Sequence, residues 1–388
     1  MRITFVTDTY SPQANGVATT LERLVKGLRE REHEVDVIRP AVLACDEDGL
    51  KVPSVGLPGY KDVRFGFPMK LVLQARWFKK RPDVIYVATE TPLGASAISA
   101  ARALGIPAAS GFHTNFQQYM AHYQLPLLEK ATMKYLRHVH NRSSCTFVPS
   151  RDVIAELEHR GFENLELLPK GVDTKLFSPK KRSHLLRREW GAGESSVVGL
   201  YVGRIAAEKN LPLILKTFLE IQKLIPDFRG VFVGDGPKLE ELKANYPQFI
   251  YAGVKRGEEL AEHYASADVF VFPSTTETFG NVTMEALASG LAVVAYDYAA
   301  ARQHIRNGEN GFAVPFDSEE AFLETAIEAA KSDVSELRKN ARSSARKVRW
   351  KKVVKRFEKQ LSKLTTEDSG EILNTNDTEQ TRSLSEVS

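Results

Sequence analysis

Two glutamates, Glu277 and Glu285, lie in the segment of this chain whose pattern best suits a ligand site. The apolar residues 268–273 predict a buried strand. The segment that follows predicts a loop, a helix that ends at Gly290, and a second apolar strand at 291–295. Glu277 is then expected in the loop at the carboxyl end of a strand, where α/β sheets bind ligands, and Glu285 is expected in the helix.

The spacing of the two carboxyl groups argues against an acid–base pair. If all eight steps between them were helical, the two residues would lie roughly 12 Å apart, at ~1.5 Å per residue. Paired glycosidase carboxylates are only about 5–9 Å apart. Glu277 and Glu285 are therefore expected to hold separate parts of one extended ligand. The alternative is a solvated acid and a helix-surface acid without a shared role.

Two cations follow another predicted buried strand, residues 197–202. Gly203, at the end of this strand, lets the backbone approach a ligand closely. Arg204 offers a planar fork for a phosphate group, and Lys209 adds a mobile charge at the start of a predicted helix, so the pair suits a diphosphate. The alternative is a basic turn on the protein surface.

A third segment completes a pattern that resembles the retaining family-four glycosyltransferases of the GT-B type. This segment is a glycine-rich turn after a predicted strand, which many α/β loops share. The matching residues, in order, are Gly203-Arg204, Glu208-Lys209-Asn210, Gly234-Asp235-Gly236-Pro237, Glu277-Thr-Phe-Gly280, Glu285-Ala and Ser289-Gly290. The resemblance covers nearly the whole chain up to about Leu364.

The resemblance implies an α/β fold with two Rossmann-like doubly wound domains that face a cleft, and a C-terminal helix that crosses back to the N-terminal domain. It also implies that Arg204 and Lys209 hold the donor diphosphate. Glu277 would hold hydroxyl groups of the donor sugar, and Glu285 the ribose of the nucleotide. The implied donor-binding residues are Gly16, Gly203, Arg204, Lys209, Asp235, Gly236, Thr278, Phe279, Gly280, Asn281 and Glu285.

Two loops of the N-terminal half carry further candidates. Gly16 opens the first predicted helix, so backbone N–H groups there could face a phosphate. The alternative is a simple Asn-Gly turn, and the family often has a Gly-Gly pair where this chain has Asn15-Gly16. His113 ends a predicted strand, where a lone histidine is more often structural. Because the family keeps a histidine there beside the reacting sugar carbon, the implied catalytic residues are His113, Glu277, Arg204 and Lys209.

The implied chemistry is the transfer of a hexose from a nucleotide-diphosphate sugar. Arg204, Lys209 and helix dipoles would stabilise the leaving diphosphate. No carboxylate is placed as a covalent nucleophile, and similar enzymes are thought to retain configuration by same-face return. We expect no metal and no cofactor, because the chain shows no paired-histidine helix, acidic triad or cysteine cluster. UDP-glucose, UDP-glucuronate and GDP-mannose all fit as the donor.

The length of 388 residues favours two domains. Strand–helix alternation predicts an N-terminal, acceptor-side domain at 1–170 and a C-terminal, nucleotide-sugar-binding domain at 171–348. Residues 349–364 have helical apolar spacing and are expected to form the crossover helix. Residues 365–388 are rich in Thr, Ser, Asn, Glu and Asp, which predicts a disordered tail.

Composition argues against several classes of protein. The net charge of +4 is too small to indicate nucleic-acid binding. No apolar run reaches the ~18–20 residues of a membrane span, and the N-terminus enters a predicted strand at once instead of a signal peptide. Cys45 and Cys145 lack metal-like spacing, so we expect free thiols in a reducing cytoplasm.

Basic and aromatic residues gather in two stretches, 61–81 and 119–142, which suits an anionic membrane surface. The alternative is a pair of packed helices with solvated basic faces. We expect a protein peripheral to the inner face of the cytoplasmic membrane. The residues expected at the membrane are Arg76, Trp77, Lys79, Lys80 and Arg81.

The segment from His113 to Arg142 also looks like bacterial glycolipid synthases of this family, namely the diacylglycerol glycosyltransferases and the lipid mannosyltransferases. This favours diacylglycerol as the acceptor, with phosphatidylinositol, a polysaccharide or a soluble acceptor as alternatives. An alternative of another class is a GT-B-shaped nucleotide-sugar epimerase or an inactive sugar-nucleotide binder. The intact cations and glutamates of the donor site argue against inactivity. The oligomeric state is left open.

Overall fold

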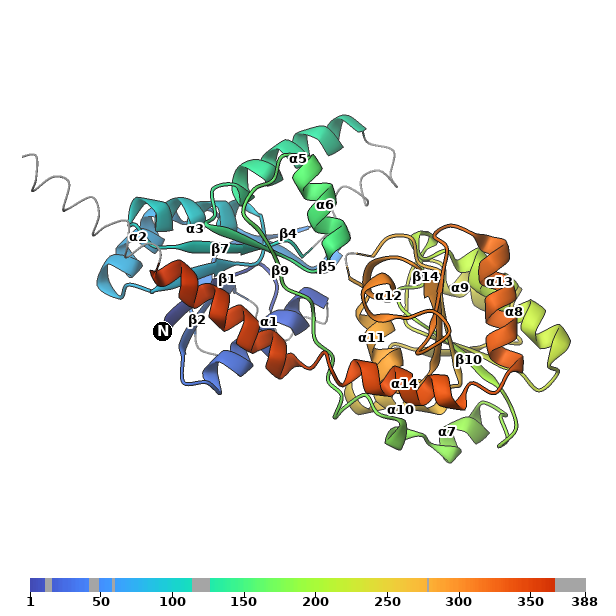
Figure 1. Cartoon of the computed structure of the whole chain (residues 1–388). Helices are drawn as coiled ribbons and strands as arrows, with labels where there is room; N and C mark the ends of the chain where they lie inside the picture. The colour runs from blue at the N-terminus through green and yellow to red at the C-terminus, as the bar shows by residue number, and fades with distance from the viewer. Residues whose placement is uncertain (11–15, 42–48, 58–59, 114–125, 278, 367–388) are drawn as a thin grey trace, which may run out of the picture. The chain divides into compact units, whose positions relative to one another are not determined.

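The chain folds into two compact units, each built on one parallel sheet with helices against it (Figure 1). The computed structural model describes residues 1–10, 16–41, 49–57, 60–113, 126–277 and 279–366. The first unit comprises residues 1–169 and the C-terminal segment from residue 350, and the second comprises 170–349. The sequence predicted the domain boundaries after residue 170 and after residue 348, each within one residue of those in the structure. The predicted fold class, two Rossmann-like α/β domains, is confirmed.

The first unit contains a parallel sheet of seven strands. These are β1 (Arg2–Val6), β2 (Glu34–Pro40), β3 (Lys51–Val52), β6 (Val84–Val87), β7 (Ala108–Gly111), β8 (Cys145–Val148) and β9 (Leu165–Leu167). Their order is β3-β2-β1-β6-β7-β8-β9, so the winding reverses between β1 and β6. A separate antiparallel pair is formed by β4 (Ser54–Leu57) and β5 (Tyr60–Gly66).

Helices cover both faces of this sheet. They are α1 (Gly16–Arg29), α2 (Lys70–Lys79), α3 (Pro92–Ala103), α5 (Pro126–His140), α6 (Arg151–His159) and a C-terminal helix at 350–366. Successive residues of a strand point to opposite faces. Ile3 and Phe5 of β1 therefore pack with α1 and the C-terminal helix, whereas Val6 packs with α2 and α3.

The C-terminal helix belongs to the first unit and lies beside α1 (Figure 1). Its core residues, spaced along one helix face, are Val353, Val354, Phe357 and Leu361. The ring centroids of Phe357 and Tyr86 are 5.0 Å apart. The expected crossing helix is thus present. It extends through residue 366, two residues into the segment predicted as a disordered tail, and the rest of that segment lies outside the described residues.

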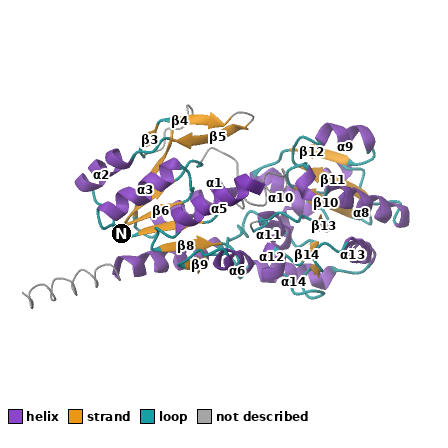
Figure 2. Cartoon of the chain, turned by 90° about the horizontal axis from the view of Figure 1, so that it is seen from above, coloured by secondary structure: helices purple, strands orange, loops and turns teal. Residues whose placement is uncertain are grey.

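The second unit contains a parallel sheet of six strands. These are β10 (Val198–Val202), β11 (Arg229–Val233), β12 (Ile250–Gly253), β13 (Val269–Phe272), β14 (Ala292–Tyr296) and β15 (Phe312–Val314). Their order, β12-β11-β10-β13-β14-β15, reverses between β10 and β13. The helices around the sheet (Figure 2) are α7 (His184–Glu189), α8 (Leu211–Leu224), α9 (Leu239–Asn245), α10 (Gly257–Ser266), α11 (Asn281–Ala288), α12 (Ala299–His304), α13 (Glu319–Lys331) and α14 (Ser335–Ala345).

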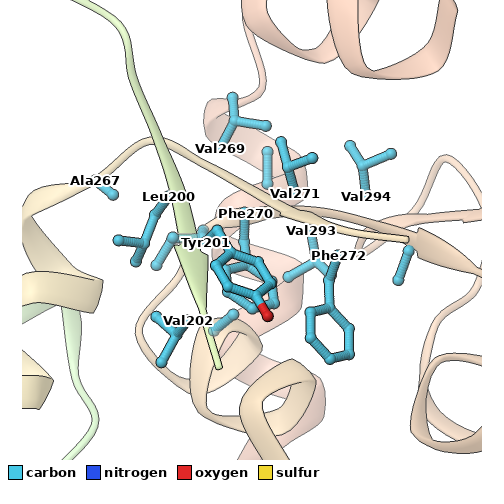
Figure 3. Close-up of a cluster of buried hydrophobic side chains, with 14 of the residues drawn as sticks. Leu200, Tyr201, Val202, Ala267, Val269, Phe270, Val271, Phe272, Val293 and Val294 are labelled. Atoms are coloured by element: carbon cyan, nitrogen blue, oxygen red, sulfur yellow. The ribbon is translucent and has the colours of Figure 1, made fainter. Parts of the chain in front are cut away.

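The central strands of the second unit are buried on both faces (Figure 3). For that reason β10, β13 and β14 are apolar along almost their whole length. Tyr201 of β10 stacks near Phe272 of β13, with ring centroids 6.3 Å apart. Such strands offer few positions for a polar functional group, so the chemistry of this unit has to come from the loops at the strand ends.

Asp268, directly before β13, ties the outer helices to the sheet. Its carboxylate bonds Arg182, Arg187 and Arg338 at N–O distances of 2.9, 2.9 and 3.2 Å. Burial by itself raises the pKa of Asp268, but the three guanidinium groups outweigh burial and lower the pKa. This ion cluster holds the amino end of β13 in place.

Replacing Phe357 with alanine is expected to destabilise the first unit by about 3–5 kcal/mol, because the ring is fully buried. Lys359 is exposed on the same helix and provides the control. Lys359→Ala should change the stability by less than ~0.5 kcal/mol. Denaturant titration measures both variants. Equally small losses would contradict a core role for this helix.

Candidate active site

The loops after β10 and β13 leave the same edge of the second sheet. The two strands are parallel neighbours, with Leu200 paired to Phe270. They also flank the point where the strand order reverses, which is where α/β sheets bind ligands. The structure therefore brings the segment 203–210 close to the segment 273–277.

The glycine-rich turn after β11 supports the loop after β10. A Cβ atom on Gly234, whose φ is +140°, would lie 2.0 Å from the carbonyl oxygen of Gly203. A Cβ atom on Gly236 would lie 2.3 Å from the carbonyl oxygen of Ile205. The Ile205 N–H group also donates to the Asp235 carbonyl oxygen at 2.9 Å. Glycine permits this close approach, so Asp235 and Gly236 have a structural role in addition to the donor contact expected of them.

Lys209 and Glu277 join the two loops. Lys209 Nζ lies 2.5 Å from Glu277 Oε1, which also accepts a hydrogen bond from Ser274 Oγ at 2.9 Å. Arg204 Nη1 lies 3.3 Å from Glu208 Oε1. The Arg204 side chain is 41% exposed, against 13% for Lys209. Each cation expected at the diphosphate therefore already has a carboxylate partner in the same two loops.

Helix α11 begins directly after the loop of β13. Gly280 precedes it with a φ of +88°, a left-handed conformation that favours glycine, and as the N-cap residue it has no side chain to cap the first turn. Phe279 is buried, and its carbonyl oxygen accepts a hydrogen bond from the Ala300 N–H group at 2.7 Å. Asn281 is the first residue of the helix, and Thr278 lies outside the described residues. The first N–H groups of α11 carry positive partial charge toward this loop.

Glu285 lies on α11, four residues after Asn281. The separation of roughly 12 Å applied only if all eight steps were helical, at ~1.5 Å per residue; the helix begins at Asn281, so that condition is not met. The Tyr264 hydroxyl donates to Glu285 Oε2 at 2.9 Å. Burial raises the pKa of Glu285 to about 7, and this hydrogen bond opposes the shift. The ionised carboxylate can accept hydrogen bonds from hydroxyl groups such as those of a ribose.

His113 follows β7 in the first unit. The Tyr86 hydroxyl is 2.6 Å from His113 Nε2. Burial raises the pKa of Tyr86, so this hydroxyl stays protonated and donates, and a neutral His113 then carries its proton on Nδ1. Gly16 is the first residue of α1, and the loop before it, residues 11–15, lies outside the described part of the chain.

Two buried acids in the first unit were missing from the predicted site. Asp8 accepts hydrogen bonds from the Gly66 N–H group (2.5 Å) and the Thr89 hydroxyl (3.0 Å), and burial raises its pKa. Glu90 Oε1 lies 3.2 Å from Nε2 of the fully buried His140. Both acids follow the two strands that flank the winding reversal of this sheet, β1 and β6. That position was the signal that could have identified them.

The structure contradicts part of the predicted membrane surface. Trp77 is 1% exposed and packs in the core of the first unit. Arg76 and Lys80 bond carboxylates of β2, and Arg81 donates to backbone carbonyl groups after α3. Lys79 is exposed. Basic and aromatic residues at helical spacing suit a helix on a sheet as well as a helix on a bilayer, which is why the prediction for Trp77 was wrong.

The second predicted membrane stretch, 119–142, also packs partly in the core. Met133, Leu136 and Val139 of α5 are buried, and residues 114–125 lie outside the described part. In the described residues, no helix is both long and apolar enough to span a bilayer. Those residues also contain no group of three or more His, Cys, Asp or Glu side chains arranged to hold a metal ion.

Glu285 is expected to make the stability of the second unit depend on pH. Its pKa is raised from 4.5 to about 7 by folding. The folded state therefore binds the proton more tightly, and stability falls as the pH rises from about 4.5 to 7, by roughly 3 kcal/mol at most. Glu285→Gln keeps an acceptor for the Tyr264 hydroxyl and removes this dependence. In thermal unfolding, the advantage of the variant over the wild type should grow from pH 5 to pH 8.

Glu240→Gln is the matched control, because the Glu240 side chain is 83% exposed. Its unfolding midpoint should follow that of the wild type at every pH. Parallel pH curves for the wild type and Glu285→Gln would contradict the raised pKa.

Two family models together match most of the chain. "Glycosyltransferase Family 4" matches residues 14–176 and "Glycosyl transferases group 1" matches 183–348. The GDP-mannose-dependent alpha-mannosyltransferase of Mycobacterium tuberculosis is 33% identical over 84% of this chain and 87% of the relative. The alpha-monoglucosyldiacylglycerol synthase of Streptococcus pneumoniae is 31% identical over 76% of this chain and 71% of the relative.

Solved structures share the fold. HepE of Anabaena, crystallised in complex with UDP, has a TM-score of 0.73 at 19% identity and covers 94% of this chain and 100% of its own. A glycosyltransferase of Rickettsia africae has a TM-score of 0.74 at 16% identity, with 94% and 98% covered. At such identities the likeness concerns the fold alone. The relatives above 30% identity and the two family models show that the chain belongs to the family-four glycosyltransferases of the GT-B type.

Proposed function

We propose that this glycosyltransferase moves a hexose, with retention of configuration, from a nucleotide-diphosphate sugar to a lipid acceptor, with diacylglycerol as the first candidate. The observation that carries the donor half is the Lys209–Glu277 pair beside the start of α11. The acceptor half is supported by relatives named as monoglucosyldiacylglycerol synthases. A lipid acceptor would place the reaction at the cytoplasmic surface of the membrane.

The donor diphosphate would bind between Arg204, Lys209 and the N-terminus of α11, where two cations and a helix dipole act together. It would compete with the present partners of the cations, Glu208 and Glu277. The diphosphate would displace the partner of Arg204 more readily than that of Lys209. The Arg204 side chain is more exposed, and its N–O distance to Glu208 is longer than that of Lys209 to Glu277. Charge that develops on the leaving diphosphate would then meet donors that are already oriented.

Retention without a covalent intermediate fits the surroundings of Glu277. An attacking carboxylate has to be free to reach the sugar, whereas Glu277 is bonded by Lys209 and Ser274, which lowers its nucleophilicity. Glu277 is better suited to hold sugar hydroxyl groups and to stabilise positive charge at the anomeric carbon. In a same-face route, the leaving phosphate oxygen accepts the proton of the acceptor hydroxyl, and no enzyme nucleophile is needed.

A transfer assay tests this proposal. The protein is incubated with UDP-glucose, UDP-glucuronate or GDP-mannose and with vesicles that contain diacylglycerol. Mass spectrometry identifies the lipid product, and NMR gives its anomeric configuration. An α-linked glycosyl-diacylglycerol from one of these donors is the expected result. A β-linked product would overturn retention, and donor turnover without a lipid product would overturn the acceptor.

Arg204→Ala and Lys209→Met should each lose about 2–4 kcal/mol of transition-state stabilisation, measured as a fall in kcat/KM. Lys216→Met is the control, since Lys216 is an exposed lysine on α8 of the same unit. Thermal unfolding shows whether each variant is folded. The assignment fails if either site variant keeps a near-wild-type kcat/KM.

The proposed membrane contact lies on the exposed side of α2. Leu71 and Phe78 are 78% and 84% exposed, and a spacing of seven places them on one helix face. Phe67, 50% exposed, precedes the helix four residues before Leu71. Lys70 and Lys79 are exposed beside these apolar groups and would meet anionic headgroups. This surface replaces the one that contained Trp77.

Leu71→Ser combined with Phe78→Ser should release the protein from vesicles that contain anionic lipid, measured by flotation. Leu185→Ser with Leu224→Ser is the matched control, because it removes two exposed leucines, at 70% and 53%, from the second unit. Transfer to a short-chain acceptor dispersed in detergent should persist in both double variants. If the α2 double variant and the control double variant float equally with the vesicles, the α2 contact is ruled out.

A further inference from the structure

Lys170 is a buried cation that the mechanism above does not use. It is the first residue of the second unit and is 8% exposed. Its Nζ lies 5.9 Å from the ring centroid of Phe279, within the range of a cation–π contact, and it faces the charge of Glu277. Within the described residues, the ammonium group has no hydrogen bond.

The ion pairs of the site do not include Lys170. Burial of Lys170 removes most of the water around its side chain, and an anionic partner would offset the cost of that dehydration. Glu277 acts on Lys170 through its charge, but the described contacts include no hydrogen bond between the two, and Glu277 Oε1 is bonded by Lys209 at 2.5 Å. Three cations, Lys170, Lys209 and Arg204, stand against the carboxylates of Glu208 and Glu277. Arg204 pairs with Glu208 and Lys209 pairs with Glu277, so among the described residues these two ion pairs leave Lys170 without a carboxylate partner of its own.

The surroundings of Lys170 suit an anion. Phe279, under the ammonium group, directly precedes Gly280 and the first turn of α11. The first N–H groups of a helix and an adjacent ammonium group without hydrogen bonds both attract negative charge. The anion that a glycosyltransferase brings to this place is the diphosphate of its donor.

We propose that Lys170 is a third donor-binding cation, whose ammonium group bonds an oxygen of the donor diphosphate at the N-terminus of α11. This inference rests on the proposed function and adds a residue to its donor site. The two negative charges of the bound diphosphate would face the Lys170 ammonium group together with the helix dipole. In this role Lys170 touches the leaving group, so its charge acts on the donor in the ground state and as the bond breaks.

This placement links donor binding to protonation. Burial lowers the pKa of Lys170 to about 8, and the Glu277 carboxylate, itself bonded to Lys209, opposes the shift. A bound diphosphate raises the pKa of Lys170, so binding at pH 8.5 takes up a proton. Glu285, with a pKa of about 7, is already ionised at that pH. A terminal phosphate, with a second pKa of about 6, is ionised as well.

Isothermal titration calorimetry at pH 8.5, with UDP and with GDP in two buffers of different ionisation enthalpy, measures affinity and proton uptake together. The wild type should take up roughly 0.7 proton per molecule bound. Lys170→Met should abolish this uptake and weaken binding about 10- to 100-fold. Lys170→Arg should keep most of the affinity without the uptake, because guanidinium stays charged. The exposed-lysine control, Lys216→Met, should match the wild type in both quantities.

Unchanged affinity and proton uptake in Lys170→Met would overturn the role of Lys170 and leave the proposed function in place. Thermal unfolding shows whether this variant is folded. If it is not, Lys170→Arg decides, because wild-type proton uptake in that variant would overturn the inference. If the wild type binds neither UDP nor GDP, the donor site itself is wrong, and the role of Lys170 falls with it.

Discussion

The pairing of β10 with β13 is the constraint on which the candidate site depends. These strands are distant in the chain but adjacent in the sheet, and their register brings the loops that follow them to one edge. Because both faces of the sheet are buried, the strands themselves are apolar and the charges are confined to those loops. Lys209 of one loop then reaches Glu277 of the other. Without this strand pairing, the two residues would have no reason to meet.

The same burial explains how much could be predicted from the sequence. Continuous apolar runs such as 269–272 identify a strand and its end, which was enough to locate the loops, Lys209 and Glu277. The contact between these two side chains could not be predicted, because each charge was interpreted as facing a ligand and the partner lies far along the chain. Trp77 was misplaced for a related reason. An amphipathic helix can pack on a sheet face or on a bilayer with the same sequence pattern. The carboxylates of β2 that bond Arg76 and Lys80 lie far from α2 in the sequence, so the local pattern does not reveal them.

The burial of Lys170 could not be predicted from the sequence pattern. A lysine in a segment between two domains is usually solvated, and only the three-dimensional arrangement reveals that this one is buried beside Phe279. The site as a whole balances most of its charges internally, through Arg204–Glu208 and Lys209–Glu277. A donor therefore exchanges partners within an existing ionic cluster, and selectivity between donors depends on how completely each one replaces those partners.

The C-terminal helix has a consequence for how the chain is made. The second unit is inserted within the first, and its two ends lie side by side, since the Val172 N–H group donates to the Val348 carbonyl oxygen at 3.0 Å. During synthesis, residues 170–349 are complete before the helix that covers Phe5 has left the ribosome. The second unit can thus finish folding first. Until the C-terminal helix is synthesised, one apolar face of the sheet of the first unit stays exposed. Nascent chains halted before residue 350 would be the ones that most need a chaperone.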